Sequence, residues 1–322
     1  MSTMRSVAST QAVTGMVALA VLIPLAGGLY DLSVGATANL TGILAVVLMN
    51  NHHWAVAPAI VLSVLVGFAV GGVNALVVVR LRVNSFIATL GMSTILAAVL
   101  VIVSGDASPT PPLSTAWNSL TQTTIGGFQI IVLYLLVLAV ILWWFMAHTP
   151  AGRYIYAIGG NSEAARLSGV RVDRWSVVAL VLSAGISGMA GVLFTSQGGP
   201  SLDFGGALLL PAFAAAFLGS TQFLPGKFNV WGTLLAIYVL ATGVQGLQLV
   251  SGAVWLSDMF NGVALILAVA MSVRRSTPAM RRRWRGGGEA GRQPAVAADS
   301  GGEPVRAEPP THVVTEEAGR SG

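Results

Sequence analysis

Residues 129–147 are QIIVLYLLVLAVILWWFMA, an apolar run without a single charged side chain. A helix needs about 20 such residues in succession to cross the hydrocarbon core of a bilayer. The run therefore predicts a membrane-spanning helix. The composition agrees, because 54% of the 322 residues are hydrophobic and only 9% are charged, whereas soluble domains carry about 25% charged residues. An ordinary soluble enzyme and a disordered chain are both excluded.

Further apolar runs lie on both sides of this one. Six more are long enough to span a bilayer, and two others lie near the lower limit of length. The six are 12–30, 56–79, 86–103, 176–196, 228–249 and 254–273, and the two short runs are 34–49 and 206–222. We therefore expect an all-α polytopic membrane protein with 8–10 transmembrane segments. Arg5 before the first run could mark a signal peptide, but no cleavage site follows, so a retained first helix is favoured.

The basic residues predict which side of the membrane the polar segments occupy. Arginines gather in 80–85, in 148–175 and at the start of 274–322, and the positive-inside rule assigns all three segments to the cytoplasm. The proline-rich segment 104–128 has no basic residue and is expected outside the cell. Beyond its arginines, the tail 274–322 is rich in Gly, Pro, Ala and Glu, a composition typical of disorder.

The number of runs conflicts with a cytoplasmic N-terminus over residues 1–11. Five complete crossings before residue 150 would carry the arginine-rich segment 148–175 to the outside. A re-entrant or broken helix over 34–49, which is short and begins near Gly35, removes the conflict and is the favoured interpretation. An N-terminus outside the cell is the alternative.

An internal repeat is visible at a constant offset of 171 residues. The matches are Gly35-Ala36 with Gly206-Ala207, Gly72-Val73 with Gly243-Val244, Leu76 with Leu247, Val79 with Val250, and Gly91 with Gly262. A register kept over this distance favours a duplication over chance. Duplicated membrane domains are typical of transporters, whose substrate route lies between the repeats.

The segment 148–175 contains the pattern of a short helix. Asn161 or Ser162 is a good N-cap, an acidic residue follows in the first turn, and a glycine stands at the C′ position. The middle carries a small apolar face, and glycines flank both ends. The residues concerned are Gly159, Gly160, Asn161, Glu163, Ala164, Ala165, Arg166, Leu167 and Gly169. An exposed apolar face favours docking into the groove of a partner, and a plain connector between helices is the alternative.

The same segment resembles a known family. GRYIYAIGGN (152–161) followed by EAARLSGV (163–170) resembles the coupling loop of permeases of ribose/xylose/galactose-type ABC importers. DLSVG (31–35), GVN (72–74) and NSFIATLG (84–91) are similar to further motifs of that family, and the resemblance covers about 12–273. The chain departs from the family at LLPAFAA (209–215), where two acidic residues are absent, and at QGL (245–247), where the family has Asn-Gly-Leu.

The resemblance implies a transmembrane permease domain over 12–273, with 148–175 as its coupling loop, in a bacterial plasma membrane. It implies import of a monosaccharide or related polyol, driven by a separate ABC ATPase subunit that docks on the residues of the short helix. An extracytoplasmic solute-binding protein and a second permease copy are the other implied partners. The chain itself is not expected to be an enzyme, because its only Gly-Lys pair, Gly226-Lys227, lacks the rest of a P-loop.

Other functions are disfavoured by the sequence. An ion-coupled secondary carrier, the main alternative, would favour an acid within a span, whereas Asp31, Asp203 and Asp258 fall at expected helix ends. A membrane scaffold without transport is a further alternative. No cofactor and no metal are expected, because the chain has no cysteine and four histidines. Nucleic acid is not an expected partner, since the arginines flank apolar runs; those of 281–285 could bind membrane lipid or anchor topology.

Uncharged polar residues within the spans are the candidates for the substrate route. They are Asn39, Asn74, Thr89, Gln245 and Gln248. Amides and hydroxyls can hydrogen-bond sugar hydroxyls, or they can join neighbouring helices at about 1 kcal/mol each. Asn74 and Gln245 lie 171 residues apart, and we expect them to face one central path.

Overall fold

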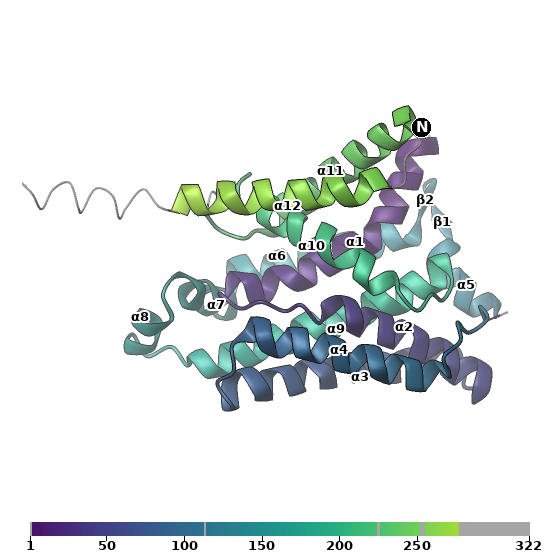
Figure 1. The fold of residues 1–322 in the computed structure, drawn as a ribbon, viewed down its shortest axis with the longest axis horizontal. Helices are drawn as coiled ribbons and strands as arrows, with labels where there is room; N and C mark the ends of the chain where they lie inside the picture. Colours follow the sequence, from purple (N-terminus) through teal and green to yellow (C-terminus); the bar gives the residue numbers. More distant parts are fainter. Residues whose placement is uncertain (1, 113, 224–225, 252–254, 277–322) are drawn as a thin grey trace, which may run out of the picture. The chain divides into compact units, whose positions relative to one another are not determined.

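The computed structural model describes residues 2–112, 114–223, 226–251 and 255–276, all within one compact unit of the chain. The expected basic and disordered tail lies outside the described residues from position 277 onward. The long apolar helices are α1 (Ser2–Ala26), α2 (Val34–Asn51), α3 (Val56–Ala75), α4 (Ser85–Ser104), α6 (Ile130–His148), α9 (Val172–Gly198) and α11 (Val230–Ser251) (Figure 1). A π-helical turn, η1 (Leu76–Arg80), extends α3.

These seven helices are long and apolar enough to cross a membrane. Two shorter apolar helices, α10 (Phe204–Gly219) and α12 (Trp255–Ser276), bring the apolar helices of the described residues to nine. Each coincides with one of the nine apolar runs in the sequence. The expectation of an all-α polytopic membrane protein is confirmed, and the expected 8–10 transmembrane segments correspond to these seven helices together with the two shorter ones.

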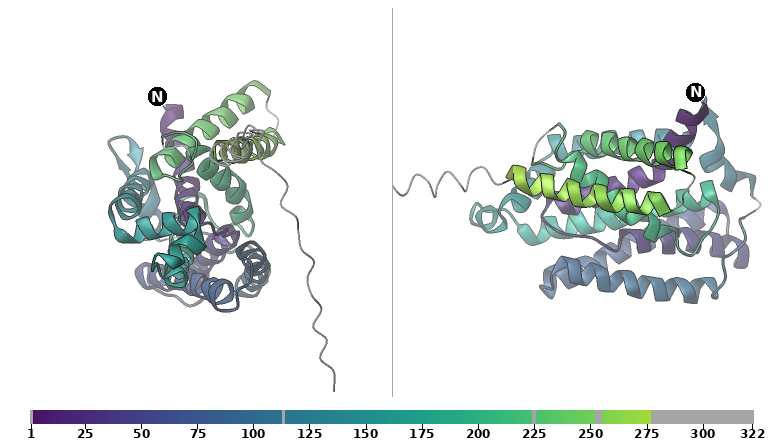
Figure 2. Two further views of the ribbon diagram at one scale, coloured as in Figure 1. Left: turned by 90° about the vertical axis from the view of Figure 1, so that its left-hand side faces the viewer. Right: turned by 45° about the horizontal axis from the view of Figure 1, so that its top comes forward.

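The remaining elements gather at two opposite ends of the helix bundle. α5 (Thr115–Gln122) and the hairpin β1 (Thr124–Ile125) and β2 (Phe128–Gln129) precede α6 and mark one end, called here the hairpin end. α7 (Pro150–Gly160) and α8 (Ser162–Leu167) connect α6 to α9 and mark the other, called the α8 end. Figure 1 and the right view of Figure 2 show this separation.

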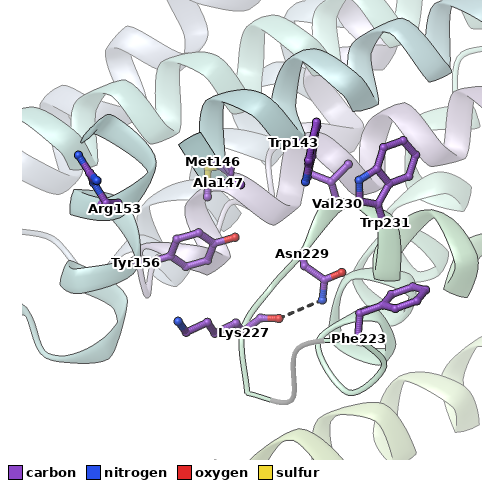
Figure 3. A pocket seen from close by; sticks show the side chains of 10 residues that line it. All are labelled: Trp143, Met146, Ala147, Arg153, Tyr156, Phe223, Lys227, Asn229, Val230 and Trp231. Carbon is purple, nitrogen blue, oxygen red and sulfur yellow. Dashed lines mark hydrogen bonds between the residues drawn. The ribbon is translucent and has the colours of Figure 1, made fainter. Parts of the chain in front are cut away.

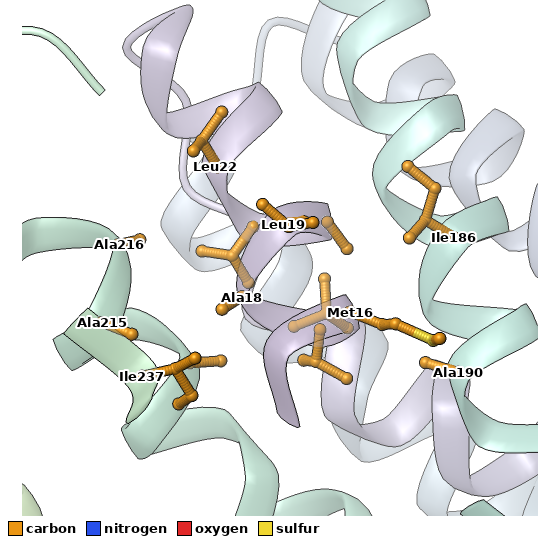
Figure 4. Close-up of a cluster of buried hydrophobic side chains, with 14 of the residues drawn as sticks. Met16, Ala18, Leu19, Leu22, Ile186, Ala190, Ala215, Ala216 and Ile237 are labelled. Atoms are coloured by element: carbon orange, nitrogen blue, oxygen red, sulfur yellow. The ribbon is translucent and has the colours of Figure 1, made fainter. Parts of the chain in front are cut away.

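The core of the bundle is built by α1, α2 and α9, which are mostly buried, whereas α3, α4 and α6 are mostly exposed. Met16, Leu19 and Leu22 of α1 are fully buried. They lie among Ile186 and Ala190 of α9, Ala215 and Ala216 of α10, and Ile237 of α11 (Figure 4). The outer helices expose large apolar side chains such as Ile102 and Ile141, a surface suited to lipid.

Glycines let α2 approach its neighbours backbone to backbone. A Cβ atom on Gly191 of α9 would overlap the carbonyl oxygen of Ala38 in α2. In the same way, Gly35 of α2 and Gly205 of α10 leave no room for a Cβ atom on either residue. Small residues at such crossings are the usual means of close helix packing in membranes. The starts of α2 and α10 therefore meet inside the bundle.

The structure contains the expected internal repeat. Adding 171 to the bounds of α1 and α4 gives 173–197 and 256–275, which nearly coincide with α9 and α12. The two halves run in opposite directions: the carbonyl of Ser9, early in α1, accepts a hydrogen bond from Gln197, the penultimate residue of α9 (3.0 Å). The repeats thus have inverted topology, and the segment with α5 to α8 lies between them.

The position of α1 corrects the expected topology. Ser9 lies at the hairpin end beside Gln197, which also bonds Gln129 of β2 (3.1 Å). The other end of α1, at Ala26, touches Gly159 of α7. Residues 2–9 and the loop 148–175 therefore lie at opposite ends of the bundle and do not share a side, contrary to the favoured interpretation. The arrangement fits the alternative, in which the two segments face opposite sides of the membrane.

The segment 34–49 is likewise not re-entrant. α2 is a continuous helix whose first residue, Val34, accepts a hydrogen bond from Ser187 near the middle of α9. Its last turn reaches the hairpin end, where Asn50 donates to the carbonyl of Thr110 (2.7 Å). Residues 27–33, which are not helical, supply the rest of this crossing from the α8 end. All five segments before residue 150 therefore cross the bundle, and the expected conflict arose from placing residues 1–11 on the same side as the loop 148–175.

Candidate functional site

A buried polar cluster holds the non-helical segment 27–33 inside the bundle. One carboxyl oxygen of Asp31 accepts hydrogen bonds from the Ser33 amide (3.1 Å) and hydroxyl (2.7 Å), and the other accepts one from Ser183 of α9 (3.0 Å). Asn74 of α3 donates to the Ser33 hydroxyl (2.8 Å). All four residues are fully buried. Because backbone without helical bonds needs such partners inside a membrane, the cluster explains how the segment crosses.

This cluster corrects the expectation that the acids lie at helix ends outside the core of the bundle, because Asp31 is fully buried. Asp31 was assigned to the interfacial end of a helix, but it lies directly before α2, beside Ser183 in the middle portion of α9. The sequence pattern was misleading because the polar residues that accompany Asp31 come from three separate segments.

Two of the expected route residues, Asn74 and Thr89, instead form hydrogen bonds with the segment 27–33. Asn74 bonds Ser33, and Thr89 of α4 accepts a hydrogen bond from the Leu32 amide (3.0 Å) while donating to the Ser85 carbonyl (2.7 Å). Both side chains are fully buried. Their contacts match the alternative role of joining neighbouring segments.

The two glutamines of α11 lie elsewhere. Gln248 donates to the hydroxyl of Ser257 in α12, and Gln245 is exposed on the surface of α11. Because Asn74 is enclosed near the α8 end of α3 while Gln245 is exposed in the last two turns of α11, the structure does not bring these two amides together. The expectation that they face one path finds no support in the described residues.

Asn39 is the one expected route residue that lines a described pocket. The pocket has a volume of about 320 Å³ and lies where α2 and α10 begin, with α4 as its third wall. Its polar side chains are Asn39, Ser93 and Asp203. Asn39 is 7% exposed, donates through Nδ2 to the Leu202 carbonyl, and has no hydrogen-bond partner for Oδ1 among the described residues.

The pocket can hold a small polar solute. Its volume lies near the lower end of the range of about 300–1,000 Å³ found for small-molecule sites. The unpaired Oδ1 of Asn39 and the carboxyl group of Asp203 are acceptors, and none of the lining residues is basic. Ser93 was not among the expected route residues, and Asp203 was expected only as a charge at a helix end. A signal existed, because Asp203 lies one residue beyond the repeat position of Asp31.

The predicted helix in the loop 148–175 is confirmed as α8. The Asn161 side chain caps it by accepting hydrogen bonds from the amides of Glu163 (3.1 Å) and Ala164 (3.0 Å). Gly169 follows the helix with φ +84°, a conformation that favours glycine. Arg166, in the last turn, forms an exposed ion pair with Asp173 of α9 (3.6 Å), and such a pair contributes little to stability.

The apolar residues of α8 divide into two groups. Ala165 is 6% exposed and packs inward, whereas Ala164 is exposed and Leu167 is 87% exposed. Ala164 and Leu167 together leave an apolar face exposed on this short helix, and a helix with such a face can dock into a groove of a partner. The exposed face of α8 is therefore the candidate docking surface.

α7 was not expected as a separate helix within the loop 148–175, and it joins α8 to the bundle. Thr149 caps it by accepting from the Gly152 amide (3.3 Å), and Pro150 occupies its first position. Gly159, one of the glycines that flank the short helix, packs so closely on Ala26 of α1 that a Cβ atom would overlap the Ala26 carbonyl oxygen. α7 is thus a fixed link, whereas Gly160 beside the Asn161 cap and Gly169 after α8 both have open space around them.

Comparison with known proteins gives consistent matches along the membrane region. The model of the family described as branched-chain amino acid transport system / permease component matches residues 3–269. The autoinducer 2 import system permease protein LsrD of Photorhabdus laumondii is 31% identical over 264 residues, covering 79% of this chain and 78% of that protein.

Two further similar proteins have a sugar in their names. The D-allose transport system permease protein AlsC of Escherichia coli is 30% identical over 242 residues, covering 75% of this chain and 74% of that protein. The ribose import permease protein RbsC of Haemophilus influenzae is 28% identical over 249 residues, covering 76% and 75%. No solved structure matches significantly.

Proposed function

The chain belongs to this permease-component family. Because similar proteins include a D-allose transport permease and a ribose import permease, we propose that it is the transmembrane subunit of an importer powered by a separate ATPase. The observation that carries the proposal is α8, a capped helix whose Leu167 is 87% exposed. Movement of a docked ATPase pair would press on α8, and the close contact between Gly159 and Ala26 would pass that displacement to α1. The inverted halves of the bundle suit alternating access.

The solute is a monosaccharide or related polyol. Asn39 offers an unpaired acceptor, and the carboxyl group of Asp203 can accept from two neighbouring hydroxyl groups. An amino acid, the solute in the description of the family, would bring a carboxylate that needs a cationic partner. The pocket residues include neither lysine nor arginine, which favours the uncharged solute. A solute-binding protein would deliver it at the hairpin end, and a second permease copy would complete the route.

The α8 end is cytoplasmic in this proposal, and the hairpin end and residues 2–9 face the outside of the inner membrane. The arginines at the α8 end support this orientation, since Arg80, Arg82, Arg153 and Arg171 all lie there. The chain has no cysteine, so single cysteines can report sidedness. A membrane-impermeant thiol reagent should label S6C and N118C in intact cells, and should label R171C only after permeabilisation. Labelling of S6C and R171C from the same side would refute the orientation.

The solute pocket is tested by Asp203→Asn and Asn39→Ala. Uptake per assembled complex should fall several-fold for either variant, or its preference among sugars should change, because each removes an acceptor from the pocket. Asp258→Asn is the matched control, since Asp258 is an exposed acid outside this pocket, on α12. If both pocket variants transport every tested sugar as the unmodified protein does, the pocket is not on the route.

An ion-coupled secondary carrier is the second candidate, and the buried Asp31 favours it, because acids within a membrane protein commonly serve ion coupling. Both oxygens of Asp31 accept hydrogen bonds from neighbouring serines, however, and Asp31 does not line the solute pocket. These contacts fit a structural role for Asp31, so the ATP-powered importer is preferred.

A further inference from the structure

A second, larger pocket lies at the α8 end and shares no lining residue with the pocket that holds Asn39. It has a volume of about 810 Å³, is open to the surface, and is lined by the end of α6, by α7, and by the start of α11 with the residues before it. Figure 3 shows Arg153 and Lys227 on one side, Trp143 and Trp231 on the other, and Tyr156 between them. This pocket is not part of the proposed solute site.

The positive charges of Arg153 and Lys227 are not neutralised by acidic side chains of the pocket. The only ion pair among the described residues is Arg166 with Asp173, so neither Arg153 nor Lys227 is paired there. No lining residue is acidic. Tyr156 donates its hydroxyl to the Phe228 carbonyl (2.5 Å), and burial raises its pKa to about 12, so the phenol remains neutral. Two exposed cations thus line one cavity, and no acid of the described residues pairs with either of them, which favours an anionic occupant.

The other side of the pocket is aromatic and partly exposed. The rings of Trp143 and Trp231 lie 6.3 Å apart, and these two residues are 39% and 40% exposed. Tryptophan is enriched where a membrane meets water, because its indole combines a large apolar body with one N–H donor. The same helices carry exposed Ile141 and Leu235. The pocket therefore joins a cationic wall to a surface suited to acyl chains.

We propose that this pocket binds the headgroup of an anionic phospholipid, with Arg153 and Lys227 at the phosphate and the two indoles along the glycerol and upper acyl chains. A free phosphate would satisfy the cations but leave the aromatic wall open. A neutral phospholipid would cover the aromatic wall but gain less from the two cations. The inference depends on membrane insertion of α6 and α11, and it does not depend on the solute or on the ATPase.

The test uses the full chain reconstituted in phosphatidylcholine vesicles that contain brominated phosphatidylglycerol or brominated phosphatidylcholine. Bromine quenches nearby tryptophans, so binding at the pocket is read as quenching of Trp143 and Trp231, after subtraction of the W143F/W231F double variant. Brominated phosphatidylglycerol should be preferred over brominated phosphatidylcholine by about 10- to 30-fold, given roughly 1 kcal/mol for each of two basic residues near a lipid surface. Inorganic phosphate should not displace it at comparable concentration.

The variant R153Q/K227Q should lose this preference, and R80Q/R82Q, which removes two arginines from the same end outside the pocket, should keep it. R153K/K227R retains both charges and should also keep it, which separates loss of charge from a folding defect. Equal quenching by the two lipids in the unmodified protein would overturn the proposal. So would displacement by inorganic phosphate, or an R153Q/K227Q variant that loses ATPase binding while its lipid preference is unchanged.

Discussion

Truncation of Leu167 tests the docking role of α8. Leu167→Ala removes three carbon atoms, and each buried group of this size contributes about 0.8 kcal/mol. Because Leu167 is 87% exposed in the isolated subunit, nearly all of this contribution arises only on docking, about 2 kcal/mol for each docked helix. The affinity of the permease for its ATPase should therefore fall about 30-fold. The stability of the permease itself should change by less than about 0.5 kcal/mol, since an exposed side chain is removed.

The assay is equilibrium binding of the purified ATPase to the permease in detergent, together with thermal unfolding of the permease alone. Leu81→Ala is the matched control, because Leu81 is also a largely exposed leucine at the α8 end, 64% exposed, but lies outside α8. Ala165→Asp is a poor test, since Ala165 is buried. If Leu167→Ala binds the ATPase as tightly as Leu81→Ala does, α8 is a plain connector and the docking role is refuted.

Three further predictions concern the fold. Gly191→Ala should lower the thermal unfolding temperature in detergent by an amount equivalent to about 1–3 kcal/mol through overpacking, while Gly198→Ala in the same helix, with open space around it, should leave it unchanged. Ser183→Ala removes a hydrogen bond to the buried Asp31 and should lower the free energy of unfolding by about 1–2 kcal/mol. An unchanged midpoint in chemical unfolding would show that this hydrogen bond does not stabilise the fold. Folding raises the pKa of Tyr156 from 10.0 to about 12, so Tyr156 ionises at a lower pH in the unfolded chain than in the folded protein. The free energy of unfolding should therefore decline as the pH rises above 10. Thermal melts at several pH values should show a weaker decline for Tyr156→Phe.

The features that the sequence predicted correctly depend on residues close together in the chain. The apolar runs coincide with the helices because length and composition alone decide whether a segment can span a bilayer. Likewise, α8 was predictable because Asn161 and Gly169 provide its cap and its C′ residue within nine positions. The offset of 171 residues also relates helices of the two halves, because the corresponding helices have similar lengths.

The features that were missed depend on distant partners. The segment 27–33 crosses without helical structure because Ser183, Asn74 and Thr89 satisfy its polar groups, and no local pattern brings these residues together. The same contacts remove Asn74 and Thr89 from the expected route. The contacts of α1 with Gln197 and Gly159 show that it begins at the hairpin end and finishes at the α8 end. The number of apolar runs in the sequence could not show this.

The most direct test of the proposed function is solute uptake by the reconstituted chain. Proteoliposomes that contain the permease, its ATPase and its solute-binding protein should accumulate a labelled monosaccharide only when ATP reaches the ATPase. Proton and sodium ionophores should leave that accumulation unchanged. Uptake by the permease alone, driven by a proton or sodium gradient and abolished by the ionophores, would contradict the proposal and would assign ion coupling to the buried Asp31 instead.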